Sequence, residues 1–106
     1  MEPKKDFFKN SIKTFCKVEN IPSQKTRFLK NDNVITINVK NQSESGLDIE
    51  CFKIINFILN LVGSTGIKFI QTPFIYPNSQ KIDKISISFE EKEYFSLINT
   101  IFDKNS

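Results

Sequence analysis

The sequence predicts a two-layer α+β sandwich, in which helices cover one face of a small mixed sheet. Residues 34–40 alternate between apolar and polar side chains, as expected of a strand with one buried face. Residues 47–62 carry apolar side chains at spacings of three and four, which is typical of a helix. A second alternating segment, residues 82–89, is followed by another helical pattern. A chain of 106 residues has room for one such domain.

The first third of the chain predicts an amphipathic helix and a linker. From Asp6 to Val18 the apolar residues lie on one side, and the lysines at 9, 13 and 17 lie on another. The lysine row is either a solvated face or an arm that contacts phosphates. Pro22 ends the helix, and residues 30–33 predict a turn. We therefore expect residues 1–33 to form an N-terminal helical extension and residues 34–106 to form the α+β domain.

The central segment predicts a strand, a helix and a second strand. The helix of residues 47–62 has Asp48 in its first turn and Gly63 as its stop signal. Residues 65–70 predict the second strand. It continues into residues 72–78, where two prolines impose an extended course. Two strands joined by a crossover helix predict a right-handed βαβ unit.

The last third predicts a strand and a helix. Residues 82–89 alternate, and the acidic run Glu90-Glu-Lys-Glu93 favours a helix start, since it meets the positive end of the helix dipole. The helix extends to Phe102. The predicted order of helix, strand, helix, strand, strand, helix is close to a ferredoxin-like topology that lacks its final strand, with two helices on one face of the sheet plus the N-terminal helix.

Composition gives no sign of catalysis. Histidine, the commonest general acid or base, is absent. The carboxylate pairs flank predicted helix starts, and the Ser64-Thr65-Gly66 turn follows a helix, as a C-terminal cap does. We expect no enzyme, no cofactor and no small-molecule substrate. The net charge of +3 permits a nucleic-acid partner without requiring one.

The two cysteines, Cys16 and Cys51, are too few for a zinc site in a chain without histidine. Cys51 lies in the apolar pattern of the central helix, so a buried free thiol is favoured, and a disulfide stays open. No apolar run reaches the roughly 18 residues of a membrane span. We expect a soluble protein, or one held by protein and RNA contacts.

The proline segment is the best candidate for a binding site. Aromatic and hydrogen-bonding side chains interleaved with lysine can hold RNA through phosphate contacts and stacking. An edge strand that leads into a solvated lysine loop would give the same pattern. The residues concerned are Lys68, Thr72, Tyr76, Asn78, Ser79, Gln80, Lys81 and Lys84.

Five short motifs in one order give the chain a resemblance to a known family. They are Ile35-Thr-Ile-Asn-Val-Lys40, Leu47-Asp48, Lys53-Ile-Ile55, Thr65-Gly-Ile-Lys-Phe69 and Pro73-Phe-Ile-Tyr-Pro-Asn78. Over these 45 or so residues the chain resembles the universal small-subunit ribosomal protein ten family, also called NusE. It departs from the family in four ways: Ile75 replaces the middle proline, the helix is one turn longer between Lys53 and Gly66, and the family's long hairpin and its final strand are missing. The resemblance is therefore to a shortened, divergent member.

The resemblance implies a structural constituent of the small-subunit head of an organellar ribosome, which contacts rRNA and neighbouring ribosomal proteins. The reduced length favours a mitochondrial ribosome, as does the heavy use of phenylalanine, isoleucine, lysine and asparagine, which is typical of an AT-rich genome. An expectation that follows is that the protein is encoded in the organelle. Carry-over from the family adds Pro73 and Pro77 to the RNA-contact residues and supports Lys68, Tyr76 and Asn78.

Three alternatives remain open. The first is a large-subunit mitochondrial ribosomal protein of the same fold. The second is a non-catalytic subunit of another complex, which would bind through an exposed apolar face of Phe7, Phe8 and Phe15. The third is a domain that binds or converts a small molecule, and it has the least support because no cluster of polar residues can be named.

Overall fold

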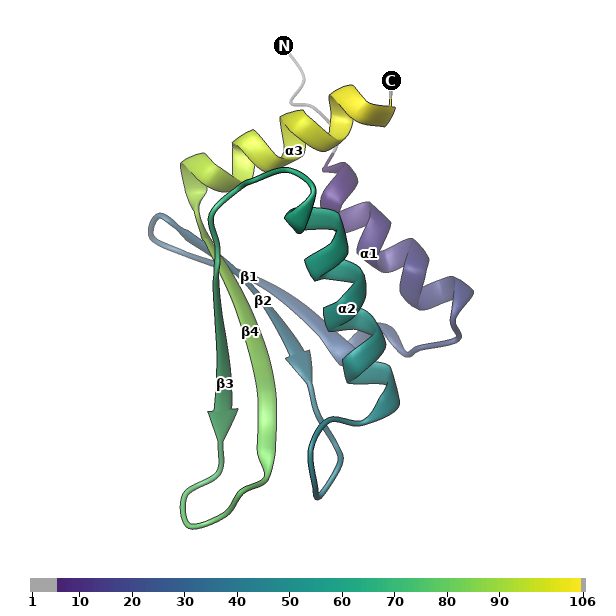
Figure 1. Cartoon of the computed structure of the whole chain (residues 1–106), viewed down its shortest axis with the longest axis vertical. Helices are drawn as coiled ribbons and strands as arrows, with labels where there is room; N and C mark the ends of the chain where they lie inside the picture. The colour runs from purple at the N-terminus through teal and green to yellow at the C-terminus, as the bar shows by residue number, and fades with distance from the viewer. Residues whose placement is uncertain (1–5, 106) are drawn as a thin grey trace.

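A computed structural model describes residues 6–105 of the chain, and the side chains of residues 6–101. The predicted α+β class is confirmed: a four-stranded sheet is packed against three helices (Figure 1). The elements are α1 (Phe7–Val18), a short 3₁₀ turn (Ser23–Lys25), β1 (Thr26–Asn31), β2 (Val34–Lys40), α2 (Ile49–Gly63), β3 (Ile70–Ile75), β4 (Ile82–Glu90) and α3 (Glu91–Asn105).

The sheet is antiparallel throughout, with the strand order β1-β2-β4-β3. The expectation of a mixed sheet was wrong, because β2 and β3 are not neighbours. After α2, strand β3 lies two positions from β2 in the sheet, and β4 then runs back and fills the position between them. β4 pairs with β2 on one side and with β3 on the other, so the βαβ unit is split by an antiparallel strand.

Strand β1 lies where a ferredoxin-like order has its last strand. In the ferredoxin-like order the last strand would lie beside the first and antiparallel to it, and β1 lies in that place beside β2. Sequence analysis missed β1 because its residues are almost all exposed or half-exposed, so no alternation marks them. Residues 26–31 therefore belong to the sheet, although they were expected to lie in an extension.

Helix α1 contributes to the same core. Phe8 is fully buried, and its ring lies edge-on to Phe89 of β4 and to Tyr94 of α3, at 5.8 Å from each. The helix is capped by Asp6, which accepts from the backbone N–H of Lys9 at 2.8 Å. The other Asp6 oxygen accepts from the Tyr94 hydroxyl at 2.5 Å. The apolar face of α1 thus holds the helices together, and the expectation that Phe8 lies on an exposed face was wrong.

Helix α2 starts after an eight-residue loop, residues 41–48, that follows β2, and it packs on β2. Asp48 is its N-cap, and Gly63 is its last residue. Cys51 and Cys16 are both free and buried. Burial, with a smaller effect of the nearby Asp48 charge, raises the pKa of Cys51 to about 11.

The second predicted strand begins later than expected. Residues 65 and 66 belong to the turn that follows the helix: the Thr65 N–H donates to the Val62 carbonyl at 2.9 Å, and Gly66 has a φ of +74°. Strand β3 starts at Ile70 and includes Pro73, which an edge strand tolerates because one side of its backbone has no partner. Within the described residues, no helix is long and apolar enough to cross a membrane.

Candidate nucleic-acid interface

The helices leave one face of the sheet uncovered (Figure 1). Side chains alternate along each strand, and the buried residues Ile37, Val39, Ile85, Ile87 and Phe89 fix which set faces the helices. The strand register assigns the opposite set to what we call the open face. It consists of Arg27, Leu29, Asn31, Val34, Thr36, Asn38, Lys40, Ile70, Thr72, Phe74, Lys84, Ser86, Ser88 and Glu90.

Hydroxyl and amide groups form the middle of the open face. Thr36 and Ser88 lie opposite each other, and their hydroxyl oxygens are 3.1 Å apart. In the next pair, the Ser86 hydroxyl donates to the Asn38 amide oxygen. These cross-strand bonds fix the side chains in place, so the middle of the face is polar and ordered.

One end of the open face is cationic. Lys40 of β2 is the direct register partner of Lys84 of β4, and Lys84 is in turn the partner of Phe74 of β3. The Lys84 ammonium lies 5.0 Å from the centre of the Phe74 ring. Arg27 of β1 lies nearby, and all three cations line one hollow of about 290 Å³. We call Arg27, Lys40, Phe74 and Lys84 the basic corner.

The cations of the basic corner have no acidic partner among residues 6–101 within ion-pair distance. One carboxylate, Asp83, also lines the hollow, and it accepts a hydrogen bond from the Tyr76 hydroxyl at 2.9 Å. Three cations against one carboxylate leave an excess of positive charge at this end of the sheet.

Lys25 borders the same hollow, but its charge is already paired. Its side chain is only 4% exposed, and its ammonium lies 2.7 Å from Asp48 and 3.7 Å from Glu50. Partial burial raises the pKa of Asp48, but hydrogen bonds from Lys25 and from the N–H groups of Cys51 and Gln42 outweigh it, so this pKa lies below its usual value. Lys25 therefore holds β1 to the start of α2 and is not available to a ligand.

The predicted RNA-contact residues from Tyr76 to Lys81 form the turn between β3 and β4, at the end of the sheet away from α3 (Figure 1). The Tyr76 N–H donates to the Lys81 carbonyl at 3.0 Å, and Asn78 adopts a φ of +59°. Pro77, Asn78, Ser79 and Gln80 are exposed.

The charged and aromatic members of this turn interact with the protein itself. The Lys81 ammonium lies 3.2 Å from Glu44 in the loop before α2, and 5.5 Å from the centre of the Tyr76 ring. The Tyr76 hydroxyl donates a hydrogen bond to Asp83, and this bond raises the pKa of Tyr76. The turn of residues 76–81 is therefore an ordered surface with little unpaired charge.

The structure divides the predicted set. Thr72 lies on the open face, whereas the register places Pro73 on the other side of β3. Lys68 precedes β3 and is separated from the turn by the whole strand, about 20 Å of chain at the usual rise per residue. The predicted residues thus form no single site, and one of them, Lys84, lies in the basic corner.

Sequence analysis missed Arg27, Lys40 and Phe74 as candidates. Arg27 was assigned to a polar linker and Lys40 to the end of a strand, and Phe74 was treated as part of the proline segment. Only the strand order brings the three beside Lys84, and no spacing in the sequence encodes that order.

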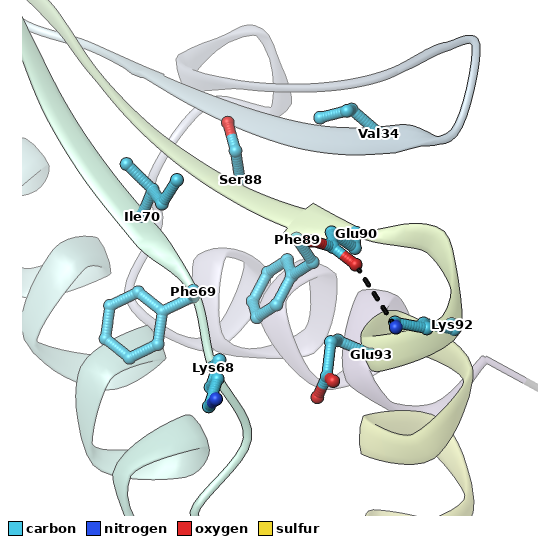
Figure 2. Close-up of a pocket in the computed structure, with 9 residues that line it drawn as sticks. All are labelled: Val34, Lys68, Phe69, Ile70, Ser88, Phe89, Glu90, Lys92 and Glu93. Carbon is cyan, nitrogen blue, oxygen red and sulfur yellow. Dashed lines mark ion pairs between the residues drawn. The ribbon is translucent and has the colours of Figure 1, made fainter.

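Lys68 belongs to a second hollow, of about 560 Å³, at the opposite end of β4 (Figure 2). Phe69 and Phe89 present rings to it, with their centres 6.1 Å apart. Its lining has two cations, Lys68 and Lys92, and two carboxylates, Glu90 and Glu93. The Lys92 ammonium lies 3.7 Å from Glu90. A hollow with balanced charges and an apolar lining is poorly suited to phosphate.

The described side chains contain no group of three or more Cys, Asp or Glu residues that could hold a metal ion. Comparisons with models of known families, with characterised proteins and with solved structures give no match for this chain.

Proposed function

We propose that this protein is a structural constituent of an organellar, most simply a mitochondrial, ribosome, where it contacts rRNA and neighbouring ribosomal proteins in the small-subunit head. The observation that carries the proposal is the agreement between the family-like motifs and the elements in which they lie. The Ile35–Lys40 motif lies in β2, and Asp48 caps α2. The Thr65-Gly66 pair lies in the turn that follows α2, and the proline motif begins in edge strand β3 and runs into the β3–β4 turn.

Two of the departures from the family correspond to identifiable parts of the structure. Six residues, 76–81, join β3 to β4, where the family carries a long hairpin. Strand β1 lies beside β2, where the resemblance would put the family's final strand, so the sheet has four strands. A member reduced in this way keeps the scaffold and has less RNA-contacting surface, which fits a location among other proteins.

Sedimentation tests the ribosomal proposal. An extract of the source organism is separated on a density gradient with and without ribonuclease, and the chain is followed with an antibody. Migration with the small subunit that is lost after ribonuclease treatment supports the proposal. Migration with the large subunit would favour a large-subunit ribosomal protein of the same fold.

A second candidate function is a non-catalytic subunit of another complex. It is favoured by apolar side chains that lie exposed outside the core, among them Ile49 and Phe52 on α2 and Ile70 and Ile75 on β3. A complex whose migration is unchanged by ribonuclease would support this candidate and contradict the ribosomal one.

A further inference from the structure

We propose that the basic corner binds single-stranded RNA, with Lys40, Lys84 and Arg27 on backbone phosphates and one base stacked on Phe74. This inference rests on the RNA partner of the proposed function, and it names the surface that would hold that partner. It shares Lys84 and Thr72 with the residues predicted from sequence, but it lies on the open face of the sheet and leaves out the β3–β4 turn.

The first argument is the juxtaposition of two like charges. Lys40 and Lys84 are directly opposite on adjacent strands, and they project from the same face. Like charges in this arrangement repel each other and destabilise a sheet. Among residues 6–101 neither lysine has an acidic partner within ion-pair distance, and the one carboxylate that lines the hollow, Asp83, accepts a hydrogen bond from Tyr76. A phosphate placed between the two ammonium groups would remove the repulsion.

The second argument is the aromatic ring beside these cations. Phe74 is 45% exposed on an edge strand, so one of its faces can be reached by a ligand. In the free protein the Lys84 ammonium lies 5.0 Å from the ring centre. A base that stacked on the ring would be followed directly by a phosphate within reach of Lys84. An aromatic platform next to cations is the arrangement by which proteins bind single strands.

The third argument concerns the choice among anionic partners. An acidic protein surface would use the cations but would give Phe74 no specific role. The bases of an RNA duplex are stacked inside the helix and cannot reach the ring. Thr72, next to Phe74 on the same face of β3, adds an exposed hydroxyl for a sugar or base. Single-stranded RNA is the partner that uses all of these groups.

The test is fluorescence anisotropy with the purified full-length protein and a labelled single-stranded RNA of 12 nucleotides and mixed sequence. Lys40→Gln with Lys84→Gln should weaken binding roughly tenfold at moderate salt, and the slope of log K against log salt should fall by roughly 1.4, about 0.7 for each lost phosphate contact. Phe74→Leu should weaken binding roughly five- to tenfold through lost stacking and leave the slope unchanged.

The matched control is Lys13→Gln with Lys17→Gln, which makes the same change of net charge on exposed positions of α1. It should change affinity less than twofold. Circular dichroism melts should show that the Lys40/Lys84 variant is at least as stable as the natural protein, because a repulsion has been removed.

Equal weakening by both lysine pairs would overturn the proposal, as would tighter binding of an RNA duplex or of poly-glutamate than of the single strand. RNA binding by the purified protein without comigration with ribosomes would uphold this inference and reject only the ribosomal function. Comigration of the protein with ribosomes, together with no effect of Lys40→Gln, Lys84→Gln or Phe74→Leu on RNA binding, would uphold the ribosomal function and reject this inference.

Discussion

At the scale of single residues, the loop between β2 and α2 depends on three buried or half-buried polar side chains. Asn41 is almost fully buried, and its amide donates to the carbonyls of Gly46 and Ile82 at 2.9 and 2.8 Å. Its oxygen accepts from the Asp48 N–H at 2.8 Å. Asp48 in turn accepts from Lys25. Sequence analysis found Asp48 as a helix-start residue, but it could not find its partners, which lie 7 and 23 positions away.

Asp48→Asn should lower the free energy of unfolding by about 2 kcal/mol, less than a fully buried pair would lose because a fifth of the Asp48 side chain is exposed. Asparagine can still cap α2, so the loss comes from the charge of buried Lys25, which keeps only Glu50 at 3.7 Å. Urea unfolding at pH 7 measures it. Glu44→Gln, which breaks the exposed pair with Lys81, is the control and should change the same quantity by less than about 0.5 kcal/mol.

The pH dependence of the same pair has a definite sign. The pKa of Asp48 is lowered by folding, so its contribution is complete above the unfolded value of about 3.9 and is lost as pH falls through the folded value. The difference in stability between the natural protein and Asp48→Asn should therefore be constant from pH 5 to 7 and should shrink below pH 4. A difference that grew on acidification would contradict this assignment.

At the scale of elements, α1 is the part of the chain whose role the sequence least predicts. Its amphipathic pattern predicts a helix, but a helix on an extension and a helix in a core have the same pattern. The structure resolves the matter through Phe8, which lies between α1, β4 and α3, and through the stacked pair of Phe15 and Phe57, with ring centres 4.4 Å apart. Removal of α1 would expose the apolar side of α2 and α3.

Phe8→Ala should lower the free energy of unfolding by about 3–5 kcal/mol, as expected for the loss of a fully buried ring. Thermal unfolding followed by circular dichroism measures it. The control is Val18→Ala at an exposed position of the same helix, which should have an effect below about 0.5 kcal/mol. Similar small effects of both substitutions would mean that α1 is a separate extension after all.

At the scale of the whole molecule, the two buried thiols report on global unfolding. Cys16 lies in α1 and Cys51 in α2, and burial raises the pKa of both. A thiol reagent should therefore modify neither in the native protein at pH 7 on the timescale of minutes, and should modify two thiols per chain in urea.

The native-state labelling rates of Cys16 and Cys51 should agree with each other if the helices and the sheet unfold as one unit. Mass spectrometry of the labelled peptides measures each rate. Much faster labelling of Cys16 would show that α1 detaches alone, and the absence of any labelled thiol in urea would indicate a disulfide between Cys16 and Cys51.

The sequence by itself determined what local periodicity can encode: the α+β class, α1, β2, α2, β4 and α3 to within a few residues, and the position of Asp48 at a helix start. It also located the exposed turn between β3 and β4. Tertiary structure alone decided the antiparallel strand order, the use of β1 as the fourth strand, the ion pair of Lys25 with Asp48, and the meeting of Lys40, Lys84 and Phe74 on one face. The reason is that hydrophobic periodicity specifies which side of an element is buried, whereas the neighbours of an edge strand or a surface charge depend on pairings between distant parts of the chain.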